Sequence, residues 1–202
     1  MEWNSEAGEP CWLVRHGEST WNVLGLVQGH SDEPVLTEVG RQQAEEAVKP
    51  FLDRAISVIY ASDLRRAQQT AEIFQTALGV TITTDPALRE RCFGVNEGLP
   101  LSAQRPEKVG ISGDRIVSVH ARPDGGESLE DLYRRVVAFV DRLQARSHQG
   151  EVIVITHGGT IRALRAYCSG ADFADVRWDD VSNASAWPVR LPVAAGTQSI
   201  HL

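Results

Sequence analysis

Two histidines in this chain stand directly before glycine, each at the end of an apolar run. His16 follows the run 11–14 and the cation of Arg15, and His157 follows the run 151–156. Open α/β sheets bind anions at the points where strands are followed by helices. An anionic ligand would therefore suit the end of such a run, where a cation, an imidazole and a glycine backbone lie together. A neutral imidazole nitrogen is also a nucleophile that needs no metal. The pattern therefore indicates a site for an anionic ligand with an imidazole beside it.

Four segments, in this order, resemble the motifs of the histidine phosphatase superfamily, which includes cofactor-dependent phosphoglycerate mutases. They are Arg15-His16-Gly17-Glu18 with Trp21-Asn22, the segment 62–71 (SDLRRAQQTA), the segment 88–98 (LRERCFGVNEG) and His157-Gly158-Gly159. The resemblance implies five catalytic residues, with the glutamate as general acid and base: Arg15, His16, Arg66, Glu90 and His157. The expected substrate-binding residues are Asn22, Gln28, Gly29 and Gly158.

Single motifs also have simpler interpretations. Taken alone, Arg66 would be a solvated residue in the first turn of a helix, and Glu90 between two arginines would form a surface ion pair. A cation in a first turn opposes the helix dipole, which favours a binding purpose for Arg66, while Arg65 is expected on the surface. The chain departs from the family pattern at Val35, which is extra, and at Asn96, where the family has tryptophan.

Strand and helix patterns alternate along the chain. Strands are expected at 11–14, 57–61, 80–84 and 151–156. Helices are expected near Trp21, over 37–54 with an interruption at Pro50, from a Ser62 cap to Leu78, after a capping box of Ser128 and Asp131, and over 158–168. The tail 178–202 suits edge strands. The alternation predicts a largely parallel sheet covered on both faces.

The resemblance implies a three-layer α/β/α sandwich, here expected as a mostly parallel six-stranded sheet with one antiparallel strand. Three of the four motifs directly follow predicted strands, so they should meet at one carboxyl edge of the sheet. The length suits a single domain over 1–202. Residues 99–126 are rich in Pro, Gly, Ser and charge, and we expect them to form a cover over the site, mostly loop.

Composition excludes several classes of protein. The net charge of −7 argues against a general nucleic-acid binder and makes any phosphate site a local island of positive potential. Cys11, Cys92 and Cys168 are far apart, so neither a disulfide framework nor a zinc site is indicated, and a reducing, cytoplasmic location is expected. Residues 1–6 lack the apolar region of a signal peptide, and no apolar run approaches membrane-spanning length. No metal or cofactor is expected, and a homodimer is left open.

Three functions are compatible with these residues. The leading one is a metal-independent phosphatase that hydrolyses a small phosphorylated metabolite through a phosphohistidine. The second is a phosphoglycerate mutase, disfavoured because only 67 positions (157 − 90) separate Glu90 from His157 and because Gln28-Gly29 stands where mutases have a Thr-Gly-Trp type sequence. The third, a non-catalytic phosphate-binding regulatory protein, is disfavoured because both histidines and the carboxylate are present. The physiological substrate stays open among sugar phosphates, glucosyl-phosphoglycerate and α-ribazole phosphate.

Overall fold

A five-stranded sheet forms the centre of the molecule. The structure, a computed structural model, describes residues 10–146 and 148–192. The strands are β1 (Pro10–Arg15), β2 (Ile56–Ala61), β3 (Ile82–Thr84), β6 (Glu151–Thr156) and β7 (Ala186–Arg190), in the order β3-β2-β6-β1-β7. All neighbours are parallel except β7, which runs antiparallel to β1. The carboxyl ends of β2, β6 and β1 therefore lie side by side.

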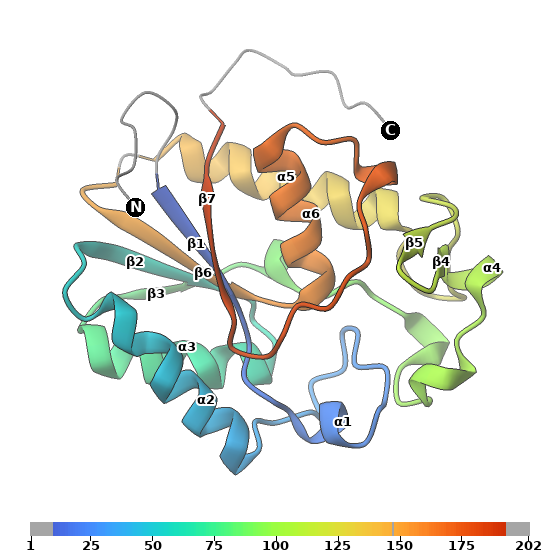
Figure 1. Ribbon diagram of the computed structural model, residues 1–202, viewed down its shortest axis with the longest axis horizontal. Coiled ribbons are helices and arrows are strands. Elements are labelled where there is room, and N and C mark those ends of the chain that lie inside the picture. Colours follow the sequence, from blue (N-terminus) through green and yellow to red (C-terminus); the bar gives the residue numbers. More distant parts are fainter. Residues whose placement is uncertain (1–9, 147, 193–202) are drawn as a thin grey trace.

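Helices cover both faces of this sheet (Figure 1). Side chains alternate along the strands, so Leu13 and Val154 pack under α5 (Leu129–Gln144) and α6 (Gly158–Ser169), whereas Val14 and Ile155 pack against α2 (Glu38–Val48) and α3 (Arg65–Leu78). Because the central strands are apolar on both faces, two separate cores form. The largely parallel sheet with helices on both faces, expected from the alternating pattern, is therefore confirmed.

The central sheet holds five strands in the part of the chain that the structure describes, so the expected sixth strand is not confirmed. The remaining described strands, β4 (Ile111–Ser112) and β5 (Arg115–Ile116), pair only with each other. Each is two residues long, and together they form a separate two-stranded sheet. The predicted tail contributes β7 at the sheet edge, and its residues 193–202 lie outside the described residues.

Local signals set most helix boundaries. Ser19 caps α1 (Thr20–Val23) and Ser128 caps α5, both through capping boxes. The helix α2 ends at Val48, and Pro50 lies in a following 3-10 turn, η1 (Lys49–Phe51). The expected Ser62 cap is wrong, because α3 begins after Leu64, which has no side-chain cap. The Ser62 hydroxyl instead lies in the site described below.

Residues 99–126 fold into short elements beside the sheet, on the right in Figure 1. They contain η4 (Leu101–Ala103), α4 (Pro106–Val109) and the β4–β5 pair. The buried Arg91 anchors this segment by donating hydrogen bonds to the carbonyls of Val109 and Ala121. Three further 3-10 turns, η2 (Pro86–Leu88), η3 (Gly94–Asn96) and η5 (Phe173–Asp175), occupy the connections. Among the described helices, none has the length and apolar character needed to cross a bilayer.

Candidate active site

A small pocket of about 170 Å³ opens at the carboxyl ends of β1, β2 and β6. Seven of the nine residues expected in the site line it: Arg15, His16, Asn22, Gln28, Gly29, Arg66 and Glu90. His157 lies beside His16, with 5.1 Å between the ring centroids. Gly158 lies beneath the pocket, since a Cβ on it would stand 3.9 Å from Arg15 Nε. The fold therefore gathers residues that are up to 143 positions apart (158 − 15).

His16 presents one nitrogen to the pocket and uses the other to fix its ring. Its Nδ1 lies 2.7 Å from the carbonyl oxygen of Gly17, which can only accept, so Nδ1 carries the proton and donates it. The lone pair is then on Nε2, which makes no hydrogen bond with the described residues. Burial, with Arg66 and Arg15 nearby, lowers the pKa of His16 well below 6.5. This imidazole is therefore neutral and nucleophilic at physiological pH.

His157 is oriented the opposite way. Its Nε2 lies 2.9 Å from the Ser62 hydroxyl, and its Nδ1 is buried and has no hydrogen-bond partner among the described residues. The Ser62 oxygen accepts the amide of Leu64, and its hydroxyl can at the same time donate to His157 Nε2. That arrangement leaves the proton on Nδ1, where it can be donated to a ligand. Burial, with Arg66 and His16 nearby, lowers the pKa of His157 well below 6.5.

Arg66 is 1% exposed and is held by the loop that precedes α2. Its terminal nitrogens donate to the carbonyls of Ser31 and Gly29 at 2.9 and 2.8 Å. Gly29 adopts a φ of 48°, a left-handed conformation that glycine tolerates, and so aims its carbonyl at the guanidinium. Burial lowers the pKa of Arg66 to about 10, so it stays charged. Its Nε is buried without a partner among the described residues. Arg65 is exposed, as expected.

A strap formed by residues 178–185 orients two more cations. Arg15 Nη1 donates to the carbonyl of Val181, and the Nε of Arg15 is another buried donor without a described partner. Arg162, one helical turn after Gly158, donates to the carbonyl of Asp179 and lies 4.7 Å from the ring centre of Trp178. Burial lowers the pKa of both arginines, and both remain cations.

Arg162 and Trp178 line the pocket but were not expected in the site. The signal for Arg162 was its position four residues after Gly158, on the same helix face. Trp178 gave no comparable signal, since it lies in a segment without regular periodicity.

Glu90 lines the same pocket as His16, from a loop between η2 and η3. Its carboxylate accepts hydrogen bonds from the backbone amides of Arg91, at 2.8 Å, and Gly159, at 3.0 Å. A Cβ at position 159 would come within 2.3 Å of the Glu90 carboxylate, so only glycine allows this approach. Gly159 therefore allows the Glu90 carboxylate to lie against the start of α6.

The hydroxyl of Ser19 contacts both amide side chains of the site, those of Asn22 and Gln28. The Ser19 hydroxyl lies 2.9 Å from the side-chain oxygens of both Asn22 and Gln28. Asn183, from the strap, donates to the same Asn22 oxygen and to the carbonyl of His16 at 3.2 Å. The Asn22 oxygen also accepts the backbone amide of Ser19 at 3.0 Å, so the single hydroxyl hydrogen of Ser19 can serve the Gln28 oxygen. The amide nitrogens of Asn22 and Gln28 are then the groups left to contact a ligand.

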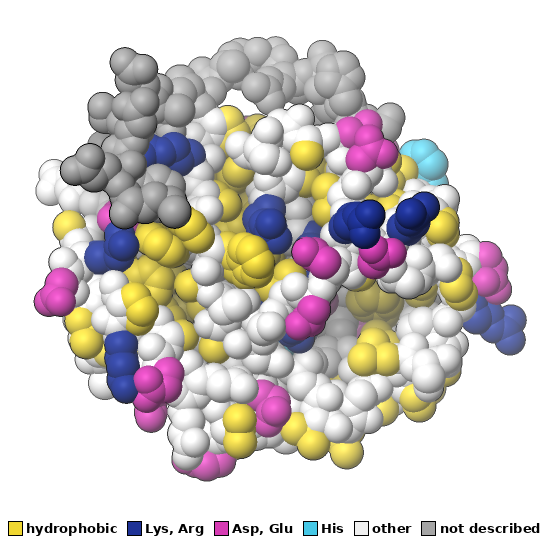
Figure 2. Space-filling view, in the orientation of Figure 1, with side chains coloured by type: hydrophobic (Ala, Val, Ile, Leu, Met, Phe, Trp, Pro, Cys, Tyr) yellow, Lys and Arg dark blue, Asp and Glu magenta, His cyan; other side chains and the backbone are white. Residues whose placement is uncertain are grey.

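The candidate site carries an excess of positive charge. Three guanidiniums, from Arg15, Arg66 and Arg162, line it with one carboxylate, Glu90. On the face drawn in Figure 2, Lys and Arg side chains are interspersed with Asp and Glu side chains. The arrangement suits a small dianion and not a long polyanion.

Comparisons with known proteins agree with this geometry. A family model described as "Histidine phosphatase superfamily (branch 1)" matches residues 11–193. Phosphoglycerate mutase-like protein 4 of Arabidopsis thaliana is 40% identical over 158 residues, covering 75% of this chain and 67% of the relative. The probable phosphoglycerate mutase GpmB of Yersinia pestis is 38% identical over 154 residues, covering 76% and 71%. The structure of mycobacterial glucosyl-3-phosphoglycerate phosphatase Rv2419c with VO3 is similar at a TM-score of 0.77, with 29% identity, covering 89% of this chain and 90% of that one.

Proposed function

Because the chain belongs to the histidine phosphatase superfamily, we propose that it is a phosphomonoester phosphatase that works through a phosphohistidine on His16. One observation carries the proposal: three buried donor atoms without described partners, on Arg15, Arg66 and His157, lie in the same site as the free Nε2 of His16. A phosphoryl group supplies the acceptors that these donors lack. The resemblance to a phosphatase structure that holds VO3 supports the same assignment.

In the first step, His16 Nε2 attacks phosphorus and the bond to the alcohol oxygen breaks. Arg15, Arg66 and His157 donate to the equatorial oxygens, where negative charge gathers in the transition state. The departing oxygen takes a proton from Glu90, which acts as the general acid in this step. The products are a phosphohistidine and the free alcohol.

In the second step, the Glu90 carboxylate takes a proton from water as the water oxygen attacks phosphorus. The bond to His16 Nε2 breaks, and the imidazole returns to its neutral form with inorganic phosphate released. The guanidiniums supply the positive charge, so we expect full turnover in the presence of a chelator. Lasting inactivation that one added divalent metal reverses would contradict this expectation.

Mutase activity is the second candidate, favoured by the names of the curated relatives. A mutase must keep water away from its phosphohistidine. Of the short segment 99–126, Leu101 lines the pocket, which is little cover for that purpose. The direct test supplies 3-phosphoglycerate with a bisphosphoglycerate primer and follows isomer and free phosphate together. Isomerisation far faster than phosphate release would refute the phosphatase assignment. If phosphate release prevails, a panel of phosphomonoesters identifies the preferred alcohol.

A further inference from the structure

The loop that carries Glu90 is held by side chains rather than by backbone pairing. Residues 87–90 present four consecutive carbonyl oxygens, and each accepts a hydrogen bond from a side chain outside the loop. Thr156 donates to the carbonyl of Leu88 at 2.6 Å, and Thr160 donates to that of Arg89 at 2.7 Å. Such bonds replace those of a strand or helix, which this stretch lacks beyond η2.

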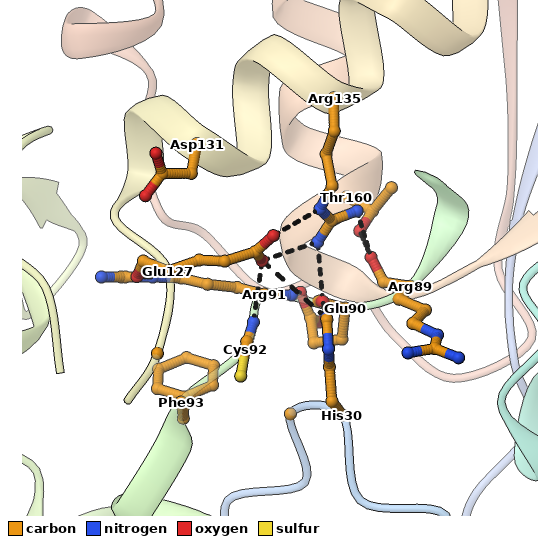
Figure 3. Close-up of polar contacts among 12 residues, drawn as sticks. His30, Arg89, Glu90, Arg91, Cys92, Phe93, Glu127, Asp131, Arg135 and Thr160 are labelled. Carbon is orange, nitrogen blue, oxygen red and sulfur yellow. Dashed lines mark hydrogen bonds and ion pairs between the residues drawn. The ribbon is translucent and has the colours of Figure 1, made fainter. Parts of the chain in front are cut away.

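Arg135 is the main donor to this loop. It reaches down from α5 in Figure 3 and donates to the carbonyls of Ala87, Arg89 and Glu90 at 2.8, 2.7 and 2.7 Å. The carboxylate of Glu127 fixes the same guanidinium through two bonds of 2.9 and 3.0 Å. Glu127 also accepts the amide of Cys92 at 2.9 Å, so it binds the loop on the far side of Glu90 as well.

His30 reaches the same carbonyl from the opposite direction (Figure 3). Its Nε2 donates to the Glu90 carbonyl oxygen at 2.8 Å and lies 3.8 Å from Glu127. The residues on either side of His30 provide the two carbonyls that hold Arg66. The loop that holds Arg66 is therefore hydrogen-bonded directly to the backbone of Glu90.

We propose that Arg135, Glu127 and His30 form a positioning unit that sets the Glu90 carboxyl against the leaving oxygen, with His30 linking it to the Arg66 loop. The proposal rests on the phosphatase function proposed above. It concerns position alone, since none of the three side chains lines the pocket. A displacement of the acid by about 1 Å is enough to lower a rate some hundredfold, so the carbonyl bonds bear directly on catalysis.

A purely structural role would have a different signature. If these bonds only held α5 to the loop, their loss would lower stability and affect all substrates alike. If they place the acid, their loss affects only substrates whose leaving group needs a proton. A nitrophenolate leaves as a stable anion, whereas the alkoxide of an alkyl phosphate does not.

The experiment compares His30→Ala with His30→Gln, whose amide can donate to the same carbonyl. His30 is suitable because its side chain is 26% exposed and Arg135 still holds the carbonyl after its removal. The matched control is His120→Ala, which removes a histidine paired with Glu130 at 2.8 Å, away from the pocket. Each variant is assayed for kcat/KM on glycerol 3-phosphate and p-nitrophenyl phosphate, for inhibition by orthovanadate and for thermal unfolding.

For His30→Ala we expect kcat/KM to fall about tenfold or more on glycerol 3-phosphate and by less than about twofold on p-nitrophenyl phosphate. The inhibition constant of vanadate should stay unchanged, and His30→Gln should recover most of the loss. Equal losses on both substrates, or no recovery by glutamine, would overturn the positioning role and leave the phosphatase function standing. A wild-type protein that hydrolyses neither substrate would overturn the proposed function, and the role of the acid with it.

Discussion

His16 and His157 end two neighbouring parallel strands, and the amide of His16 bonds to the carbonyl of Thr156 at 2.9 Å. Their surroundings nevertheless differ in one decisive respect. His16 donates Nδ1 to a backbone carbonyl and presents a lone pair on Nε2, while His157 engages Nε2 with the Ser62 hydroxyl and presents Nδ1. Two similar positions can thus present a lone pair in one ring and a hydrogen-bond donor in the other, because the second hydrogen bond of each ring decides which nitrogen faces the pocket.

The largest expected effect comes from deleting the two rings separately. His16→Ala should abolish turnover, a loss on the order of 10⁶-fold, and no phosphoenzyme should form. His157→Ala should still form phosphohistidine, about 10²- to 10³-fold more slowly, because it loses a donor and keeps the nucleophile. Rapid quench with a labelled substrate measures both. Residual activity of His16→Ala within tenfold of the wild type would move the nucleophile elsewhere.

Glu90→Gln separates proton transfer from anion binding. Glutamine keeps the shape but transfers no proton, so turnover of alkyl phosphates should fall about 10²- to 10⁴-fold. Vanadate affinity should be retained, since the arginines and both rings are intact. Full activity in this variant would place the acid at another carboxylate, with Glu18 and Glu97 as the next to test.

Ser62→Ala tests the orientation of His157 directly. Without the hydroxyl, Nε2 loses the partner that holds the proton on Nδ1, so the donor form becomes one of two tautomers. We expect kcat/KM to fall about tenfold, in keeping with partial loss of one donor. Nitrogen NMR of the imidazole should show the change of tautomer. Ser112→Ala, which removes an exposed hydroxyl from β4, is the control and should leave both readouts unchanged.

The smallest expected effect is on the pH dependence. Because burial lowers the pKa of both rings, they stay neutral as the pH falls through 6.5, and the acid limb of kcat/KM should lie below that of an ordinary histidine. The unfolded chain does protonate near pH 6.5, so folding stability should decline below that value, by up to about 1.4 kcal/mol per pH unit for each ring. Urea unfolding at several pH values checks this. His16→Gln should reduce the change of unfolding free energy with pH by the contribution of one imidazole. An unchanged pH dependence would contradict the conclusion that the His16 ring is buried in its neutral form.

The sequence predicts the main parts of the site because its motifs are local. Apolar runs 11–14 and 151–156 become adjacent parallel strands, so the residues that follow them must meet. The sequence does not predict the contacts that assign roles. Asp179 and Val181 act through backbone carbonyls, which any residue type supplies, and His30 is an isolated histidine in a loop. Ser62 has the pattern of a helix cap, yet its hydroxyl serves a histidine 95 positions away.

The strand order of the sheet also bears on how the protein is made. Strand β1 carries His16 at its end, but both of its neighbours come late in the chain: Val14 pairs with Ile155 on one side and with Ala186 on the other. At translation rates of ~5–20 residues per second, the 171 positions from Arg15 to Ala186 (186 − 15) take roughly ten to thirty-five seconds to synthesise. Throughout that interval β1 is an apolar strand with no partner on at least one edge, which is the condition under which nascent chains associate wrongly. The strand that leads to His16 therefore stays open to wrong association for most of the time that the chain takes to be made.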